Sequence, residues 1–175
     1  GVALAGADAG NYLLGGPITA QADITVRPLV VTATGVSRVY DATTGATVTF
    51  SHDGIGGDDL GFSYTASFAD KHVASGKPIT INAFALTGGD AGNYSAAPPA
   101  GATADITPAP LTVAITAADR TYDGTTAAEI LTRTLQGVFA GDDVSVTGGT
   151  ASFEDKNVGT GKMVTATGLL TGGAD

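Results

Sequence analysis

The sequence predicts an all-β protein made of tandem immunoglobulin-like β-sandwich modules, each about 82 to 85 residues long. Short segments of alternating apolar and polar residues are separated by turns rich in Gly, Asp, Asn and Ser. The same motifs also return in the same order along the chain. No segment has a convincing helical pattern, because the best candidate, residues 127–136, aligns with the strand-like residues 45–52.

The expected strands of the central module are, in chain order, residues 29–34, 46–52, 60–68, 78–86 and 103–107. The first follows Pro28, as residues 111–116 follow Pro110, and a proline commonly marks the entry to a strand. The next three have the period of two that half-buried strands show. The last closes the period before the motifs begin again.

The repeat is visible in pairs of motifs whose separation stays nearly constant. The pairs are YDATT (40–44) with YDGTT (122–126), GDD at 57–59 and 141–143, FADKHVASGK (68–77) with FEDKNVGTGK (153–162), GADAGNY (6–12) with GGDAGNY (88–94), and ADIT at 22–25 and 104–107. A motif that recurs once per module is more typical of a turn or a core position than of an enzyme site.

The order of these motifs predicts the module boundaries. Residues 1–28 would be the C-terminal part of a preceding repeat, residues 29–109 a complete repeat, and residues 110–175 the N-terminal part of a following one. The last part lacks a DAGNY and an ADIT segment, so we expect an exposed strand edge that residues 1–27 of another copy could cover by β-strand addition. The interpretation that we favour is an arbitrary window on a longer array, with neighbouring repeats of the same chain as its partners.

The YDG motif predicts a structural role rather than a ligand contact. Tyr40 and Tyr122 are expected to bury their rings at the edge of the sandwich while each hydroxyl group finds a backbone acceptor. Asp41 and Asp123 would shape a turn through their side chains, with Gly124 where little bulk fits.

Composition and charge argue against several function classes. The formal net charge is −9 and the eight basic residues are scattered, which disfavours nucleic acid and anionic membrane surfaces as partners. No apolar run is long enough for membrane insertion as a helix. With no Cys, and with His52 and His72 at positions that do not repeat, an enzyme is not expected and no catalytic residue is assigned.

Calcium is the one cofactor that the sequence suggests as a candidate. The acidic loops contain oxygen ligands of the kind that Ca²⁺ takes, namely Asp58, Asp59, Asp90, Asp142 and Asp143. No stretch matches the spaced aspartates of a calcium loop, so tight turns are the simpler interpretation, and no other cofactor is expected. Lys71 and Lys156 are expected to be solvated and paired with a nearby carboxylate.

The motif order ADITP, YDGTT, GDD, FEDKNVGTGK and GGDAGNY resembles the YDG-type repeat of large bacterial surface proteins, the filamentous-haemagglutinin-like adhesins and exoproteins. The resemblance implies an extracellular location at the bacterial surface and a stalk or fibre that supports adhesion, aggregation or biofilm. The alternative is a multivalent module with a weak carbohydrate or protein site in each repeat. The low aromatic content, 6% with no Trp, favours the stalk.

Overall fold

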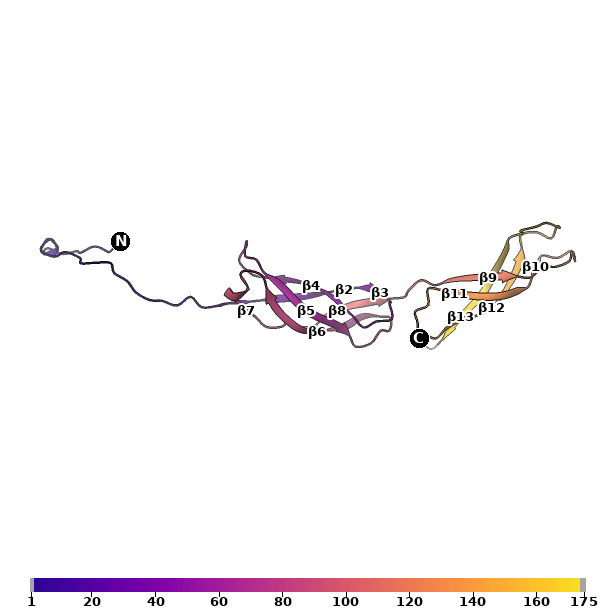
Figure 1. The fold of residues 1–175 in the computed structure, drawn as a ribbon, viewed down its shortest axis with the longest axis horizontal. Coiled ribbons are helices and arrows are strands. Elements are labelled where there is room, and N and C mark those ends of the chain that lie inside the picture. The colour runs from indigo at the N-terminus through magenta and orange to yellow at the C-terminus, as the bar shows by residue number, and fades with distance from the viewer. Residues whose placement is uncertain (1, 174–175) are drawn as a thin grey trace.

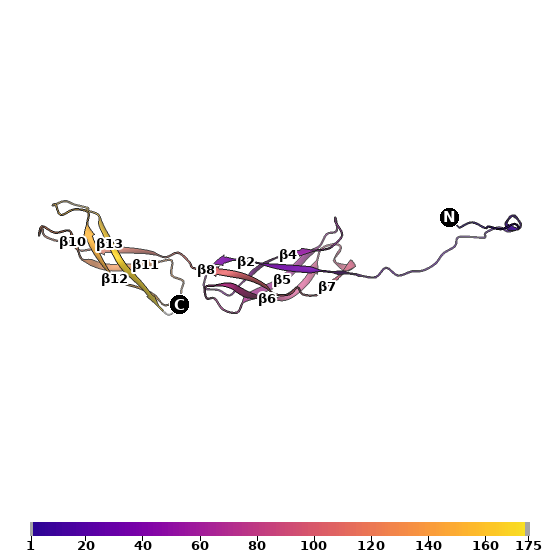
Figure 2. The same cartoon turned by 180° about the vertical axis from the view of Figure 1, so that it is seen from behind.

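Residues 2–173 are described by a computed structural model, and their fold is all-β. Two modules lie end to end, and residues 2–26 extend from the first module away from the second (Figure 1). The same arrangement is seen from behind (Figure 2). None of the helices in residues 2–173 has the length and apolar character needed to cross a membrane.

The first module contains strands β1 to β8. Their bounds are β1 Arg27–Leu29, β2 Val31–Val36, β3 Arg38–Val39, β4 Thr47–His52, β5 Gly61–Phe68, β6 Ala74–Thr87, β7 Tyr94–Ala96 and β8 Ala102–Thr107. Two 3₁₀ helices, η1 (Ala9–Asn11) and η2 (Ala91–Asn93), lie in the two copies of the DAGNY motif. The predicted strands are all present, with ends that differ by a few residues from those expected.

Two sheets of the first module enclose its main core. One pairs β2 with β4, and the other has the order β3-β8-β6-β5. Alternate residues of the long strands face inward, which buries Val48, Phe68, Ile79 and Ile106 in one cluster. Ile106 is the most buried of these, with 1% of its surface exposed. The core therefore depends on β8, the strand that carries the ADIT motif.

A second, smaller core lies at the other end of the first module. Leu29, Val31 and Tyr94 are buried there and pack against aromatic and aliphatic side chains that include Phe50 and Leu60. The DAGNY tyrosine reaches this place because β7 pairs in parallel with β1, with Tyr94 opposite Arg27. This parallel pair was not expected from the sequence.

The second module repeats only part of this arrangement. Its strands are β9 Thr112–Ala117, β10 Ala127–Ala128, β11 Ile130–Gln136, β12 Val144–Phe153 and β13 Val164–Gly173. They form the pair β9–β11 and the sheet β10-β12-β13, which correspond to β2–β4 and to β5–β6 of the first module. Residues 127–136 form strands rather than a helix, as their alignment with the first module predicted. No counterpart of β7 or β8 occurs among the described residues, and none of residues 108–173 is fully buried.

Candidate functional site at the joint between the modules

Tyr40 lies beside the segment that links the two modules. The short strand β3 runs parallel to the end of β8, and the Tyr40 amide then donates a hydrogen bond to the Thr107 carbonyl oxygen at 2.8 Å. Pro108 follows at once in the linker. The YDG motif is therefore held at the C-terminal end of its module, where the next module begins.

The rest of the motif forms a turn stabilised by its aspartate. Asp41 Oδ1 accepts hydrogen bonds from the Thr43 amide at 2.9 Å and from the Thr43 hydroxyl at 2.8 Å, and Arg38 pairs with Asp41. Ala42 has a positive φ of 63°, a conformation that glycine adopts more easily. Gly124 fills this position in the second module.

The turn of the second module is built in the same way. Asp123 Oδ1 accepts a hydrogen bond from the Thr125 amide at 2.9 Å, Arg120 pairs with Asp123 at 2.9 Å, and Gly124 has a φ of 81°. Each turn is stabilised by residues of its own module. The tyrosine that precedes the first turn, by contrast, contacts the second module.

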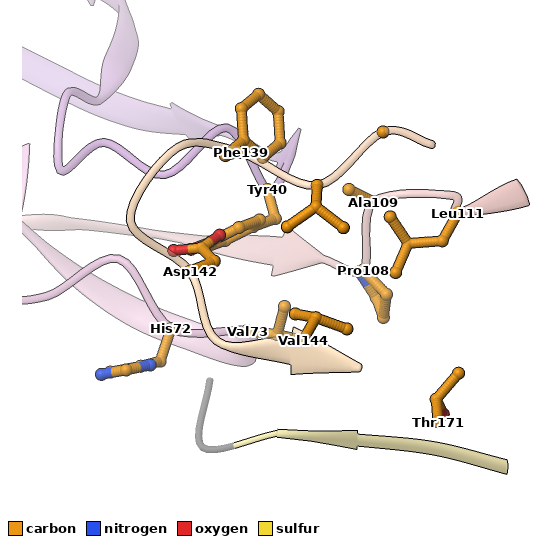
Figure 3. A pocket seen from close by; sticks show the side chains of 12 residues that line it. Tyr40, His72, Val73, Pro108, Ala109, Leu111, Phe139, Asp142, Val144 and Thr171 are labelled. Atoms are coloured by element: carbon orange, nitrogen blue, oxygen red, sulfur yellow. The ribbon is translucent and has the colours of Figure 1, made fainter. Parts of the chain in front are cut away.

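Tyr40 reaches across the joint to the GDD motif of the second module. Its hydroxyl donates a hydrogen bond to Asp142 Oδ2 at 2.7 Å, and Lys71 forms an ion pair with Asp142 Oδ1. The Tyr40 ring also meets Phe139 edge to face, with 5.7 Å between ring centroids (Figure 3). The Asp142 side chain is only 5% exposed. We call Tyr40, Lys71, Phe139 and Asp142 the joint cluster.

The loop that carries Asp142 has the same shape as its counterpart in the first module. The Asp142 amide donates a hydrogen bond to the Phe139 carbonyl oxygen at 3.2 Å, and the Asp58 amide donates one to the Ile55 carbonyl oxygen at 3.2 Å. Asp58 Oδ2 also accepts a hydrogen bond, at 2.5 Å, from the hydroxyl of Tyr94 in its own module. The GDD aspartate therefore accepts a tyrosine hydroxyl in both modules, once within the module and once across the joint.

The environment of the joint cluster keeps Asp142 ionised and Tyr40 neutral. The hydrogen bond from Lys71, and then that from Tyr40, lower the pKa of Asp142 below its ordinary value. Burial, followed by the hydrogen bond to the Asp142 carboxylate, raises the pKa of Tyr40. An ionised acceptor with a neutral and a cationic donor is the combination that makes strong charge-assisted hydrogen bonds.

These pKa shifts predict how the joint responds to pH. The lowered pKa of Asp142 means that its contribution is complete above the ordinary carboxyl pKa of 3.8 and is lost as the pH falls through the lower, folded value. The raised pKa of Tyr40 means that its contribution is complete below 10.0 and is lost as the pH rises through the higher, folded value. We expect the hydrogen bond between Tyr40 and Asp142 to persist between those two ordinary values, as followed by NMR of the Tyr40 hydroxyl and the Asp142 carboxyl carbon. Loss of this hydrogen bond inside that interval would contradict this description of the joint.

Two expectations for the YDG tyrosines are wrong. The Tyr40 hydroxyl donates a hydrogen bond to a side chain of the next module and not to a backbone acceptor, while its half-buried ring packs against the main core of the first module. Tyr122 is 57% exposed, since no further module among the described residues lies against it. Only the recurrence of both the tyrosine and the GDD aspartate once per module could have indicated a contact between modules.

The FxDKxVxxGK motif contains ion pairs that the sequence did not reveal. Lys77 is buried, pairs with Asp70 and donates to the His72 carbonyl at 2.8 Å. Lys162 repeats this with Asp155 and with the Asn157 carbonyl at 2.9 Å. In both modules the second lysine of the motif pairs with the aspartate seven residues before it and so stabilises the loop between them. The first lysine of the first module, Lys71, pairs with Asp142 across the joint.

The other acidic residues considered for calcium serve the turns of the first module. Asp59 Oδ2 accepts a hydrogen bond from the Gly89 amide at 2.8 Å, and Asp90 Oδ2 accepts one from the Asp59 amide at 2.8 Å. Within residues 2–173 no group of three Asp, Glu, His or Cys residues is placed to hold a metal ion. Asp142 and its neighbour Asp143 lie on the loop of the second module that faces the joint. The Asp142 carboxylate there already accepts a hydrogen bond from Tyr40 and pairs with Lys71.

An apolar hollow of about 410 Å³ lies next to the joint cluster. Figure 3 shows Pro108 and Leu111 from the linker on one side and Val73 with Val144 on another, while Tyr40 and Asp142 lie together at its edge. Most of the residues that line the hollow are apolar, and its polar side chains are those of Tyr40, His72, Asp142 and Thr171. The chemistry of this site is that of a contact between two modules.

Comparison with known families gives one result. The YDG domain family matches the chain twice, over residues 25–103 and 107–175. The boundary between the two matches falls within β8, shortly before the linker that separates the two modules of the structure. No curated protein and no solved structure matches the chain.

Proposed function

This chain belongs to the YDG domain family, and we propose that its repeats form a stalk of a bacterial cell-surface or secreted adhesin. In this proposal each repeat is an immunoglobulin-like bead that adds length and spaces an adhesive part from the cell. The role is mechanical and extracellular, and it requires neither a cofactor nor catalysis.

The joint cluster is the observation that carries the proposal. A stalk needs neighbouring modules to keep a fixed direction, and a flexible linker alone would let them pivot. Here a buried carboxylate of one module is bonded to both Tyr40 and Lys71 of the other, which restricts rotation about the joint. The linker adds to this restriction because Pro108 and Pro110 have fixed φ angles.

The residues of the joint cluster are spaced to repeat along an array. Tyr40 and Lys71 have Tyr122 and Lys156 as their counterparts, while Asp142 has Asp58. Each module therefore carries a tyrosine and a lysine at one end and a GDD aspartate at the other. Head-to-tail repetition of one contact is a simple way to make a long and straight particle.

The net charge of −9 is consistent with this role. Like charge keeps an extended array soluble and opposes the collapse of parallel fibres.

The proposal predicts that removing Asp142 makes the joint flexible while both modules stay folded. Since the chain has no Cys, spin labels can be placed only at the two introduced sites Thr80→Cys and Thr165→Cys, which are exposed and equivalent in the two modules. We expect a narrow distance distribution between the labels in the wild type and a clearly broader one in Asp142→Ala.

The matched control is Asp123→Ala. It removes an aspartate ion pair from the same module, with Arg120, but at the end away from the joint, and should leave the distance distribution narrow. A distribution that is equally broad in the wild type and in Asp142→Ala would show that the joint does not fix the modules and would remove the main support for a stalk.

A further inference from the structure

The chain enters and leaves the first module at opposite ends. β1 begins at Arg27 at one end, and β8 ends at Thr107 at the other end, beside the linker to the second module (Figure 1). Tension along the chain therefore acts on the module at Arg27 and at Thr107. The strand pairs that connect these two points decide how strongly the module resists such tension.

Two extended stretches of the chain lie side by side between these points. They are the entry run, which is residues 27–39 with β1, β2 and β3, and the exit run, which is residues 94–107 with β7 and β8. The two runs pair in parallel at both ends, with Arg27 opposite Tyr94 and Arg38 opposite Ile106. The paired residues are 67 positions apart at the first end and 68 at the second, so the runs keep one register along the module.

Contacts between β2 and β8 keep the same register. The Asp105 amide donates a hydrogen bond to Ser37 Oγ at 3.0 Å. Gly35 lies so close to the exit run that a methyl group there would be 2.3 Å from the Thr103 carbonyl oxygen. The second half of the entry run is therefore in contact with β8 before the parallel pair with β3 begins.

The connection between β7 and β8 has little slack. Residues 97–101 contain Pro98 and Pro99, whose fixed φ angles favour an extended backbone. The change in register from 67 to 68 means that the entry run covers the same distance with only one residue fewer. A load on the exit run is therefore transmitted to both of its parallel pairs.

We propose that the entry and exit runs form a mechanical clamp through which the first module bears tension along the chain. Pulling the two ends of the module apart slides two parallel runs lengthwise past each other, so the β1–β7 pair, the β3–β8 pair and the contacts between them must break together. Strands that are pulled apart from the same end would separate one residue pair at a time. The resistance follows from the strand arrangement alone, and only its use under load rests on the stalk function proposed above.

Buried side chains oppose the same sliding motion. Leu29 of the entry run and Tyr94 of the exit run share the smaller core, and Ile106 of the exit run belongs to the main core. The Val30 amide also donates a hydrogen bond to Asp53 Oδ1 at 2.9 Å, which ties the entry run to the loop after β4. A slip of one residue would turn each buried side chain of a strand to the opposite face, so the runs cannot slide stepwise without losing this burial.

Single-molecule pulling of the whole chain in two directions tests the proposal. Since the chain has no Cys, handles can be attached to pairs of introduced cysteines. Gln21→Cys with Ala109→Cys loads the two runs lengthwise. Gln21→Cys with Asn93→Cys pulls instead on the adjacent starts of the two runs and peels them apart, since Arg27 is opposite Tyr94.

We expect the lengthwise pair of handles to need a several-fold higher unfolding force than the peeling pair at the same loading rate. Forced unfolding is governed by the barrier to unfolding, and the lengthwise barrier contains all the contacts between the runs. Equal forces in the two directions, or a lower force lengthwise, would overturn the proposal. Neither pair of handles lies in the second module, so a flexible joint would remove support for the stalk without changing these forces.

Two matched variants show whether the resistance comes from contacts between the runs. Ser37→Ala removes the hydrogen bond to the Asp105 amide, whereas Thr65→Val removes a hydrogen bond of 3.3 Å to the Asn82 carbonyl oxygen, which joins β5 to β6 outside both runs. Both side chains are exposed, so neither change should unfold the module.

We expect Ser37→Ala alone to lower the lengthwise unfolding force. The peeling force should stay unchanged in both variants, because peeling begins at the β1–β7 end and Ser37 lies next to β3 at the other end. A lengthwise force that both variants lower equally, or that neither lowers, would place the resistance elsewhere in the module and contradict the clamp.

Discussion

Replacing Ile106 with alanine should lower the free energy of unfolding of the first module by about 2 to 5 kcal/mol. Ile106 is 1% exposed and packs in the cluster formed by strands of both sheets, so its removal loses apolar burial and leaves a cavity that neighbouring strands cannot fill without moving. The unfolding of the first module can be followed by chemical denaturation with NMR signals assigned to each module.

The control for this prediction is Ile24→Ala, the same change at the equivalent position of the N-terminal segment. Ile24 is exposed, so this variant should unfold like the wild type. Equal stability of the Ile106→Ala variant and the wild type would mean that β8 does not hold the two sheets of the first module together.

A second large effect is expected from Gly35→Ala. A methyl group at Gly35 would lie 2.3 Å from the Thr103 carbonyl oxygen and 2.8 Å from Ile79 Cδ1, which is far inside van der Waals contact. The oxygen belongs to the backbone of β8, so β2 and β8 would have to separate. We expect a loss of about 1 to 3 kcal/mol or more in the stability of the first module, measured by the same denaturation experiment.

Gly45→Ala is the matched control within the same module. The nearest atom to a methyl group there is the Thr43 hydroxyl oxygen, at 3.9 Å, which is an ordinary contact. Position 117, the counterpart of Gly35 in the second module, is already alanine, and no β8 counterpart lies against it in residues 2–173. A Gly35→Ala variant as stable as Gly45→Ala would show that β2 and β8 are not packed as closely as described.

The strands could be predicted from the sequence because two independent signals agreed on them. Alternation placed each strand, and the second copy of the motif resolved ambiguous cases such as residues 127–136, which are strands although their composition suits a helix. Turn positions followed from the side chains of Asp41 and Asp123, whose bonds to nearby backbone amides are local in sequence.

The contacts of the joint could not be predicted in this way. Tyr40 and Asp142 are separated by 102 residues, and a repeat shows which positions are equivalent but not which of them meet. The same limit applies to the GDD motif, because Asp58 binds a tyrosine of its own module while Asp142 binds one from the preceding module. The burial of Lys77 was missed because its partner lies seven residues away across a glycine turn.

The most direct test of the fixed joint is the relative orientation of the two modules in solution. Residual dipolar couplings from residues 27–107 and 112–173 of the wild type would be fitted separately. If Tyr40 and Lys71 hold Asp142 as described, both modules should give the same alignment tensor in size and direction, and the couplings should fit the end-to-end arrangement of Figure 1. Two tensors of clearly different size would show that the modules reorient independently and would contradict the account.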